Sequence, residues 1–144
     1  MRFCTTWLIR NGSYYLLAVE RDRLDYPALK RRVLDLYHQH RPHAVLIEDK
    51  GSGTQLIQEL RHAGSVHPIA ITPQGDKIMR ASNQTAQIEA GRIVIPEDAP
   101  WLGEFQREVA AFPNGRHDDQ IDSMTQFLAW AMENEFNAPR IRFL

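Results

Sequence analysis

Two apolar, β-branched runs open the chain at residues 3–9 and 14–19, and Asn11-Gly12 lies between them. Asn-Gly between two such runs is the strongest short-range signal for a β-hairpin, so two antiparallel strands are expected here. A helix follows and ends near residue 41. Asp25 can cap this helix, Pro27 suits its first turn, and the later apolar residues recur on one face.

The middle of the chain alternates between short apolar runs and helical patterns. Residues 44–47 form a continuous apolar run, which is typical of a strand buried on both faces, and Glu48 stands at its carboxyl end. Residues 51–54 then turn into a helix that stops near Gly64. A short strand is expected at 68–71, a polar helix at 77–90 closed by Gly91, and another short strand at 93–95.

Two amphipathic helices are predicted in the last third of the chain. The first starts at Pro100 and carries the apolar stripe Trp101, Phe105, Val109 and Phe112. The second runs from about residue 119 to 134, and four of its residues are expected to face inward: Ile121, Met124, Leu128 and Ala131. A hairpin followed by alternating helices and strands predicts an α/β fold, with a mixed sheet flanked by helices.

Composition narrows the function classes. With 144 residues, 43% of them hydrophobic, the chain is expected to form one domain at 1–137 followed by a tail at 138–144. A net charge of −1 gives no overall basic field of the kind that stable nucleic-acid binders use, but it allows an enzyme with a local basic rim. The single cysteine, Cys4, excludes a disulfide framework. No apolar run is long enough to span a membrane, and the chain reads as an intracellular protein.

Three carboxylates crowd the start of the last predicted helix, at Asp118, Asp119 and Asp122. Acidic side chains at a helix start can cap backbone N–H groups and suit the helix dipole. One aspartate is enough for that role, and three close together repel one another unless a cation lies among them. Oxygen ligands of this kind suit Mg²⁺ or Mn²⁺. The stretch alone leaves both the capping and the metal interpretation open.

Glu48 is the second acidic candidate. In open α/β sheets, functional groups collect at the carboxyl ends of strands, although a lone acid there also occurs as a loop charge or a cap. Together with the three aspartates it could hold one or two divalent cations. Asp49 points to the opposite side by strand alternation. His117 is either a metal ligand or general base, or a residue that caps or packs locally.

Two further groups are candidates for binding phosphate. Lys77 and Arg80 lie one helical turn apart, where they are either solvated charges or hold a substrate phosphate near the metals. Residues 51–54 lack the Gly-Lys-Ser/Thr ending of a nucleotide-binding loop, and a tight turn with an N-cap is the favoured interpretation. The start of that helix, with Ser52 and Thr54, could still touch a DNA phosphate.

In order along the chain, a series of motifs resembles the carboxy-terminal nuclease domain of tailed-bacteriophage terminase large subunits. These motifs are residues 47–53 and 56–60, Gly75-Asp76-Lys77 and Arg80, residues 89–92 and Pro96, Trp101, Phe112-Pro113, and residues 117–122. The resemblance implies an RNase H-like fold and endonucleolytic cutting of concatemeric double-stranded phage or prophage DNA during packaging in the bacterial cytoplasm. It also implies two Mg²⁺ or Mn²⁺ ions in the complete domain.

The resemblance further assigns residues and partners. Glu48 matches the second catalytic acid, and the block from Asp118 to Asp122 holds the third, so Glu48, Asp119 and Asp122 are the expected catalytic residues and Asp118 a further metal ligand. Lys77 matches a lysine near the site. The implied partners are DNA, the terminase ATPase domain, the small subunit and the portal.

Two departures from the family pattern stand out. No ATPase motif is present, and the first central strand, which carries the first catalytic Asp in the family, is expected to be missing. A gap in the sheet would follow, which residues 141–144 of the same or a neighbouring chain could fill, and strand exchange would then make a homodimer. Cutting is therefore expected to be weak or absent. The alternatives are a non-catalytic DNA-docking or assembly module that retains the fold, and an RNase H-like resolvase or transposase remnant.

Overall fold

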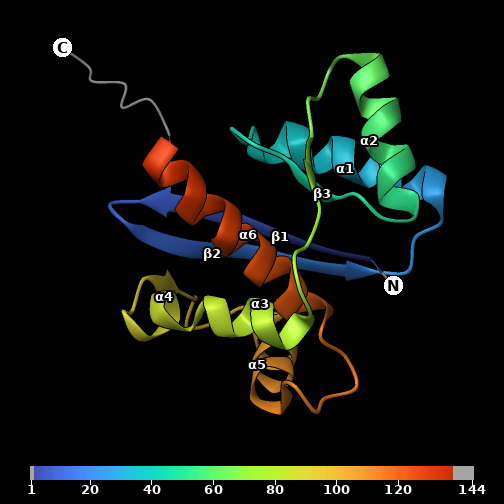
Figure 1. The fold of residues 1–144 in the computed structure, drawn as a ribbon. Helices are drawn as coiled ribbons and strands as arrows, with labels where there is room; N and C mark the ends of the chain where they lie inside the picture. Colours follow the sequence, from blue (N-terminus) through green and yellow to red (C-terminus); the bar gives the residue numbers. More distant parts are fainter. Residues whose placement is uncertain (1, 138–144) are drawn as a thin grey trace. The chain divides into compact units, whose positions relative to one another are not determined.

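The structure, a computed structural model, describes residues 2–137 (Figure 1). These residues form two compact units. The first holds Arg2 and Arg21–Gln74, and the second holds Phe3–Glu20 together with residues 75–137. The predicted tail at 138–144, with its proposed strand at 141–144, lies outside the described residues.

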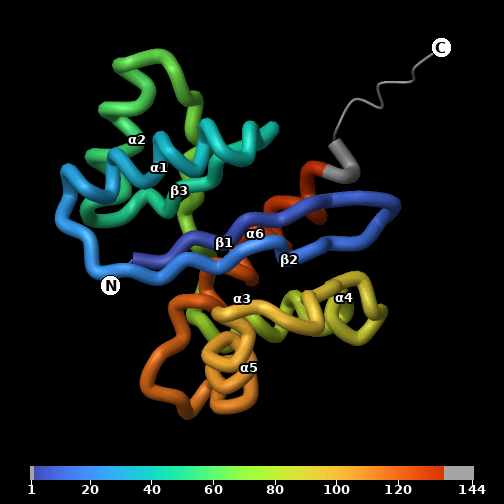
Figure 2. The backbone as a smooth tube through the Cα atoms, turned by 180° about the vertical axis from the view of Figure 1, so that it is seen from behind, coloured from blue at the N-terminus to red at the C-terminus, as the bar shows by residue number. Residues whose placement is uncertain are grey.

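A mixed sheet forms the centre of the second unit. Strands β1 (Arg2–Arg10) and β2 (Ser13–Asp22) make the predicted hairpin, the blue pair in Figure 2, and β5 (Ile93–Val94) lies parallel to β2. Asn11 and Gly12 have φ values of 51° and 75°. Two successive positive φ values define the turn whose twist matches that of the paired strands, which explains why Asn-Gly stands there.

Four helices complete this unit: α3 (Lys77–Asn83), α4 (Thr85–Glu89), α5 (Leu102–Ala111) and α6 (Asp119–Asn137). The core joins β2 to α5 and α6 and includes Tyr14, Phe105 and Leu128. All four predicted inward residues of α6 are buried, so that prediction is confirmed. The side chain of Trp7 stacks on Phe127 with 4.7 Å between ring centroids, and all three tryptophans pack against this core.

The first unit consists of α1 (Tyr26–His40), β3 (Leu46–Glu48), α2 (Ser52–Ala63) and β4 (Ile69–Ile71). β3 and β4 are parallel and form a separate two-stranded sheet. Asp25 caps α1 as predicted, with its carboxylate accepting the Ala28 N–H at 2.9 Å. Leu56, Leu60 and Val66 form the core of the unit, against which apolar residues of α1 pack.

Three details of the sequence interpretation are wrong. The helix predicted at 77–90 is divided at Gln84, where hydrogen bonds switch to a tighter i→i+3 spacing and the Gln84 and Gln87 side chains become buried. Residues 44–47 are only half-buried, and the observed strand β3 covers just Leu46–Glu48 and, among the described residues, pairs only with β4. On α5, Val109 is exposed and Glu108 takes the inward position.

The fold class is confirmed: the chain is α/β, with a mixed sheet flanked by helices, as in an RNase H-like fold. Of the described helices, none is long and apolar enough to cross a membrane.

Candidate functional site

The three aspartates come together at the start of α6. One carboxylate oxygen from each of Asp118, Asp119 and Asp122 lies within 4.8 Å of the other two. Asp118 and Asp122 are half-buried, and Asp119 is exposed. Asp118 directly precedes the helix, and its backbone C=O accepts the N–H of Asp122 at 2.9 Å. The spacing of the residues on the first helical turn therefore brings the three carboxylates together, as the sequence predicted.

Two cations from α3 face this cluster. The ammonium of Lys77 donates to an Asp118 oxygen at 2.7 Å and lies 3.2 Å from an Asp122 oxygen. The guanidinium of Arg80 lies 3.4 Å from the other Asp122 oxygen. The hydrogen bond to Asp118, and then the interaction with Asp122, raise the pKa of Lys77 above its usual value. The Asp119 carboxylate has neither a hydrogen bond nor an ion pair with any residue of 2–137, so Lys77 and Arg80 pair with only two of the three carboxylates.

The capping interpretation of the aspartates can be checked directly. Within residues 2–137, none of the three carboxylates accepts a backbone N–H of α6; Asp118 and Asp122 face Lys77 and Arg80 instead. A capping side chain would accept the N–H of the second or third helical residue. The three carboxylates are therefore not used as side-chain caps of α6 within the described residues.

Glu108 supplies the cap from α5. Its carboxylate accepts the Ile121 N–H at 2.8 Å and the Gln120 side-chain amide at 3.3 Å, and only 8% of the residue is exposed. Burial raises the pKa of Glu108 above its usual range, and the nearby charge of Asp119 adds to this, whereas hydrogen bonds from Ile121 and Gln120 act in the opposite direction. The start of α6 is thus fixed by a neighbouring helix.

A second contact holds the same helical turn from the sheet. The hydroxyls of Thr5 on β1 and Ser123 on α6 are 2.8 Å apart, and the Trp7 indole N–H donates to Thr5 at 2.9 Å. Ser123 follows Asp122 directly. Side chains from β1 and α5 therefore hold the acid-bearing turn from two elements of the same unit.

Glu48 belongs to the other unit, where it is the last residue of β3 and pairs in register with Ile71 of β4. Its side chain is exposed and has no hydrogen bond or ion pair with the part of the chain that is described. The backbone around it is tightly fixed. A Cβ on Gly53 would lie 2.1 Å from the Glu48 carbonyl oxygen, so the first turn of α2 can approach the strand end only with glycine there.

The candidate phosphate ligands beside Glu48 are engaged within their own unit. The Ser52 hydroxyl accepts a hydrogen bond from Arg2 at 2.6 Å, and the Thr54 hydroxyl donates to Asp49 at 2.7 Å. Neither side chain caps α2, which starts after Gly51 without a side-chain cap.

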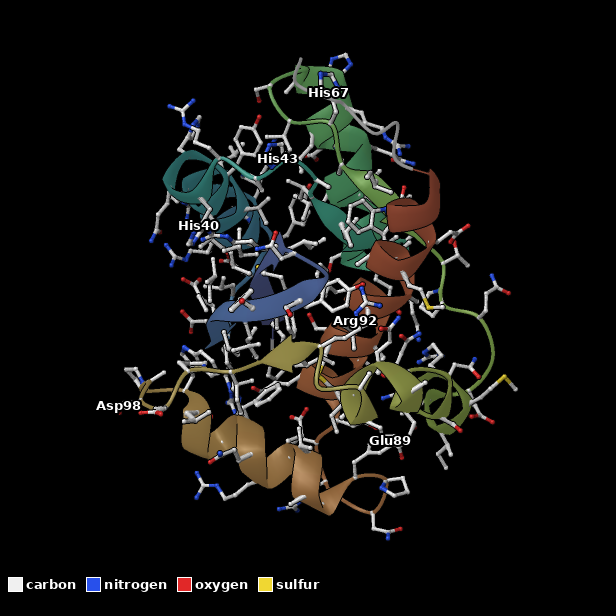
Figure 3. The ribbon with its side chains drawn as sticks, turned by 90° about the vertical axis from the view of Figure 1, so that its left-hand side faces the viewer. His40, His43, His67, Glu89, Arg92 and Asp98 are labelled. Carbon is white, nitrogen blue, oxygen red and sulfur yellow. The ribbon has the colours of Figure 1, made fainter. Side chains whose placement is uncertain are left out.

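His117 is exposed and separate from the hydrogen bonds that fix the start of α6. Of the other histidines, four are exposed and His40 is half-buried; Figure 3 labels His40, His43 and His67. Among residues 2–137, only the three aspartates form a cluster of potential metal ligands.

Sequence reasoning missed Glu108 and Thr5 of this unit, and it noted Arg92 only as part of the motif at residues 89–92. Arg92, labelled in Figure 3, donates to the Gly12 carbonyl and the Gln87 side chain, both at 2.7 Å, and lies over the Tyr14 ring. For Glu108, the sequence did offer a signal, because an acidic residue lies next to the apolar stripe of α5. The other two depend on contacts with distant parts of the chain, which periodicity does not predict.

The local chemistry of the cluster combines hard oxygen ligands with adjacent positive charge. Such a set fits a divalent cation held by carboxylates, with an anion beside it.

Residues 3–130 match the family model described as "Terminase RNaseH-like domain". A search of curated proteins found no match.

Proposed function

The chain belongs to the terminase RNaseH-like domain family, and on that premise we propose that it is the nuclease module of a terminase large subunit. In this proposal it cuts concatemeric double-stranded DNA during phage or prophage genome packaging in the bacterial cytoplasm. Its expected partners are DNA, the terminase ATPase domain, the small subunit and the portal. Strand exchange through residues 141–144 would add a homodimer.

The proposed metal ligands are Glu48 and the three aspartates, which would hold Mg²⁺ or Mn²⁺. The observation that carries the proposal is that three converging carboxylates at the start of α6 are not used to cap it. Keeping such charges together costs free energy, which a bound cation would offset. Bound metal would supply a nucleophilic hydroxide and stabilise the leaving oxygen of a phosphodiester.

Lys77 and Arg80 are the proposed phosphate ligands on the side of the aspartates. Both lie against the cluster, so a DNA phosphate held next to the carboxylates would also meet positive charge. On the side of Glu48, Ser52 and Thr54 stand at the start of α2, where backbone N–H groups favour an anion.

Calorimetry with Mn²⁺ tests this proposal, using the wild-type chain, Glu48→Gln and Asp119→Asn. Asp98→Asn and Glu97→Gln serve as matched controls, because both residues are exposed and lie in a loop before α5. We expect wild type and controls to bind Mn²⁺ and both site variants to lose binding. Nicking of a supercoiled plasmid with Mn²⁺ is expected to be weak, and any nicking should follow the same order.

The outcomes separate the parts of the proposal. Loss of binding in Asp119→Asn alone would keep a metal site at α6 and remove Glu48 from it. Plasmid nicking that is equally strong in all variants would contradict the whole assignment.

A second candidate function is a non-catalytic DNA-docking or assembly module. One observation favours it: Lys77 and Arg80 already compensate much of the negative charge of the cluster without a metal. In that case the wild-type chain would bind no Mn²⁺ and would retain affinity for DNA.

A further inference from the structure

We propose that Glu108 is a positioning residue for the metal site, because it caps α6 and so leaves the three aspartates available as ligands. This inference rests on the proposed function, since it concerns how the same site is held in place. Glu108 itself is not a ligand and takes no part in the reaction.

The start of α6 is capped by a side chain from another helix. A helix start leaves backbone N–H groups without partners, and the residue just before the helix normally supplies a side-chain oxygen. In α6 that residue is Asp118, whose carboxylate bonds to Lys77 at 2.7 Å. Glu108 accepts the Ile121 N–H instead, and it is ten residues before Asp118 on a different helix.

The surroundings of Glu108 disfavour its negative charge. Its carboxylate is buried and lies near Asp119, and both conditions disfavour the ionised form and raise its pKa. Such a group needs compensation, which it receives from the Ile121 N–H and the Gln120 amide. An exposed aspartate could make the same cap at lower cost. Because the cap comes from α5, it leaves the aspartate oxygens clear of the backbone N–H groups of α6.

Removing the Glu108 carboxylate would leave the Ile121 N–H without its acceptor. With an apolar residue at 108, the Ile121 N–H needs another oxygen, and Asp118 of the cluster stands at the position whose side chain normally accepts this N–H. A carboxylate that turned back onto the helix would leave the group of three oxygens that now lie within 4.8 Å of one another. Removing a side chain that orients metal ligands commonly costs about 10–100-fold in metal affinity.

The experiment measures Mn²⁺ affinity by calorimetry for wild type, Glu108→Leu and Glu108→Gln, at a temperature where circular dichroism shows each fully folded. Glutamine keeps an oxygen that can accept the Ile121 N–H, so it separates the hydrogen bond from the charge. Gln106→Leu is the matched control, since it introduces the same residue at an exposed position of the same helix. The amide shift of Ile121, measured by NMR, reports the cap itself.

We expect Glu108→Leu to weaken Mn²⁺ binding by about 10–100-fold and to shift the Ile121 amide, with Glu108→Gln and Gln106→Leu close to wild type. A folded Glu108→Leu protein with wild-type Mn²⁺ affinity would overturn the inference and leave the proposed function standing. If the wild-type chain bound no Mn²⁺, the inference and the proposed function would both be contradicted. The wild-type measurement therefore distinguishes a failure of the inference alone from a failure of the proposed function. If Glu108→Leu does not fold, the Glu108→Gln protein decides. A wild-type Ile121 amide shift together with wild-type Mn²⁺ affinity supports the inference. A wild-type Ile121 amide shift together with lost Mn²⁺ affinity overturns it.

Discussion

The two units present their acidic residues in different ways. Glu48 stands alone at the end of β3, exposed and without an ion pair among the described residues, and only the backbone fixes its position. The aspartates of the other unit are grouped, face two cations and lie on a turn held by Glu108 and Thr5. The α6 cluster is therefore arranged by residues of its own unit, whereas no described side chain holds the Glu48 carboxylate in place.

The largest expected effect is the loss of stability caused by a cavity in the core of each unit in turn. Leu60 and Leu128 are both fully buried, one in each unit, and replacing either by alanine should cost about 2–5 kcal/mol of unfolding free energy. Hydrogen exchange should show the loss of protection mainly in the unit that carries the change. Equal loss in both units after either substitution would show that they unfold as one cooperative body.

Gly53→Ala tests the backbone that fixes Glu48. The added Cβ would meet the Glu48 carbonyl oxygen, so the strand end or the first turn of α2 has to move, at a cost of about 1–3 kcal/mol. Thermal unfolding measures the cost, and NMR shifts should change around residues 46–54. Gly103→Ala, where a Cβ would meet nothing within 4 Å, is the matched control and should be nearly neutral.

Lys77→Met tests how far Lys77 compensates the negative charge of the aspartates. Loss of an exposed ion pair should change stability by less than about 1 kcal/mol. Mn²⁺ affinity should rise, because a competing cation leaves the cluster, while binding to DNA weakens. Calorimetry and DNA-binding titrations at fixed salt measure the two changes, and a fall in Mn²⁺ affinity would show that Lys77 supports the metal site.

The smallest expected effect is a pH dependence confined to the first unit. Burial, and then the neighbouring Glu59 carboxylate, raise the pKa of Tyr26 to about 12, although its hydroxyl makes no hydrogen bond within the usual geometric limits. The fold therefore favours the neutral phenol. Its contribution to stability is fully present below pH 10 and is lost as the pH rises through 12. Denaturation should show a constant stability difference between wild type and Tyr26→Phe below pH 10, and wild type should lose stability relative to the variant as the pH rises from 10 to 12.

Much of the fold follows from local sequence signals. The Asn11-Gly12 hairpin, the Asp25 cap and the inward face of α6 depend on neighbouring residues, and all are confirmed. The division of the helix at Gln84 and the inward position of Glu108 depend on tertiary burial, which outweighs periodicity. In the site, the approach of the three aspartates follows from helical spacing, whereas Lys77 and Arg80 reach them from a segment about forty residues away.

The second unit is discontinuous in sequence, since the whole stretch Arg21–Gln74 is inserted into it. Pairing of Tyr14 with Ile93 requires closure of a long loop, at an entropic cost of about 3–4 kcal/mol for a chain of that length, whereas the inserted unit is built from residues close in sequence. On the ribosome, the inserted unit can therefore form as soon as it has emerged. The core around β2 includes residues of α6, so it can be completed only after α6 has been synthesised, and the aspartates assemble later than the inserted unit.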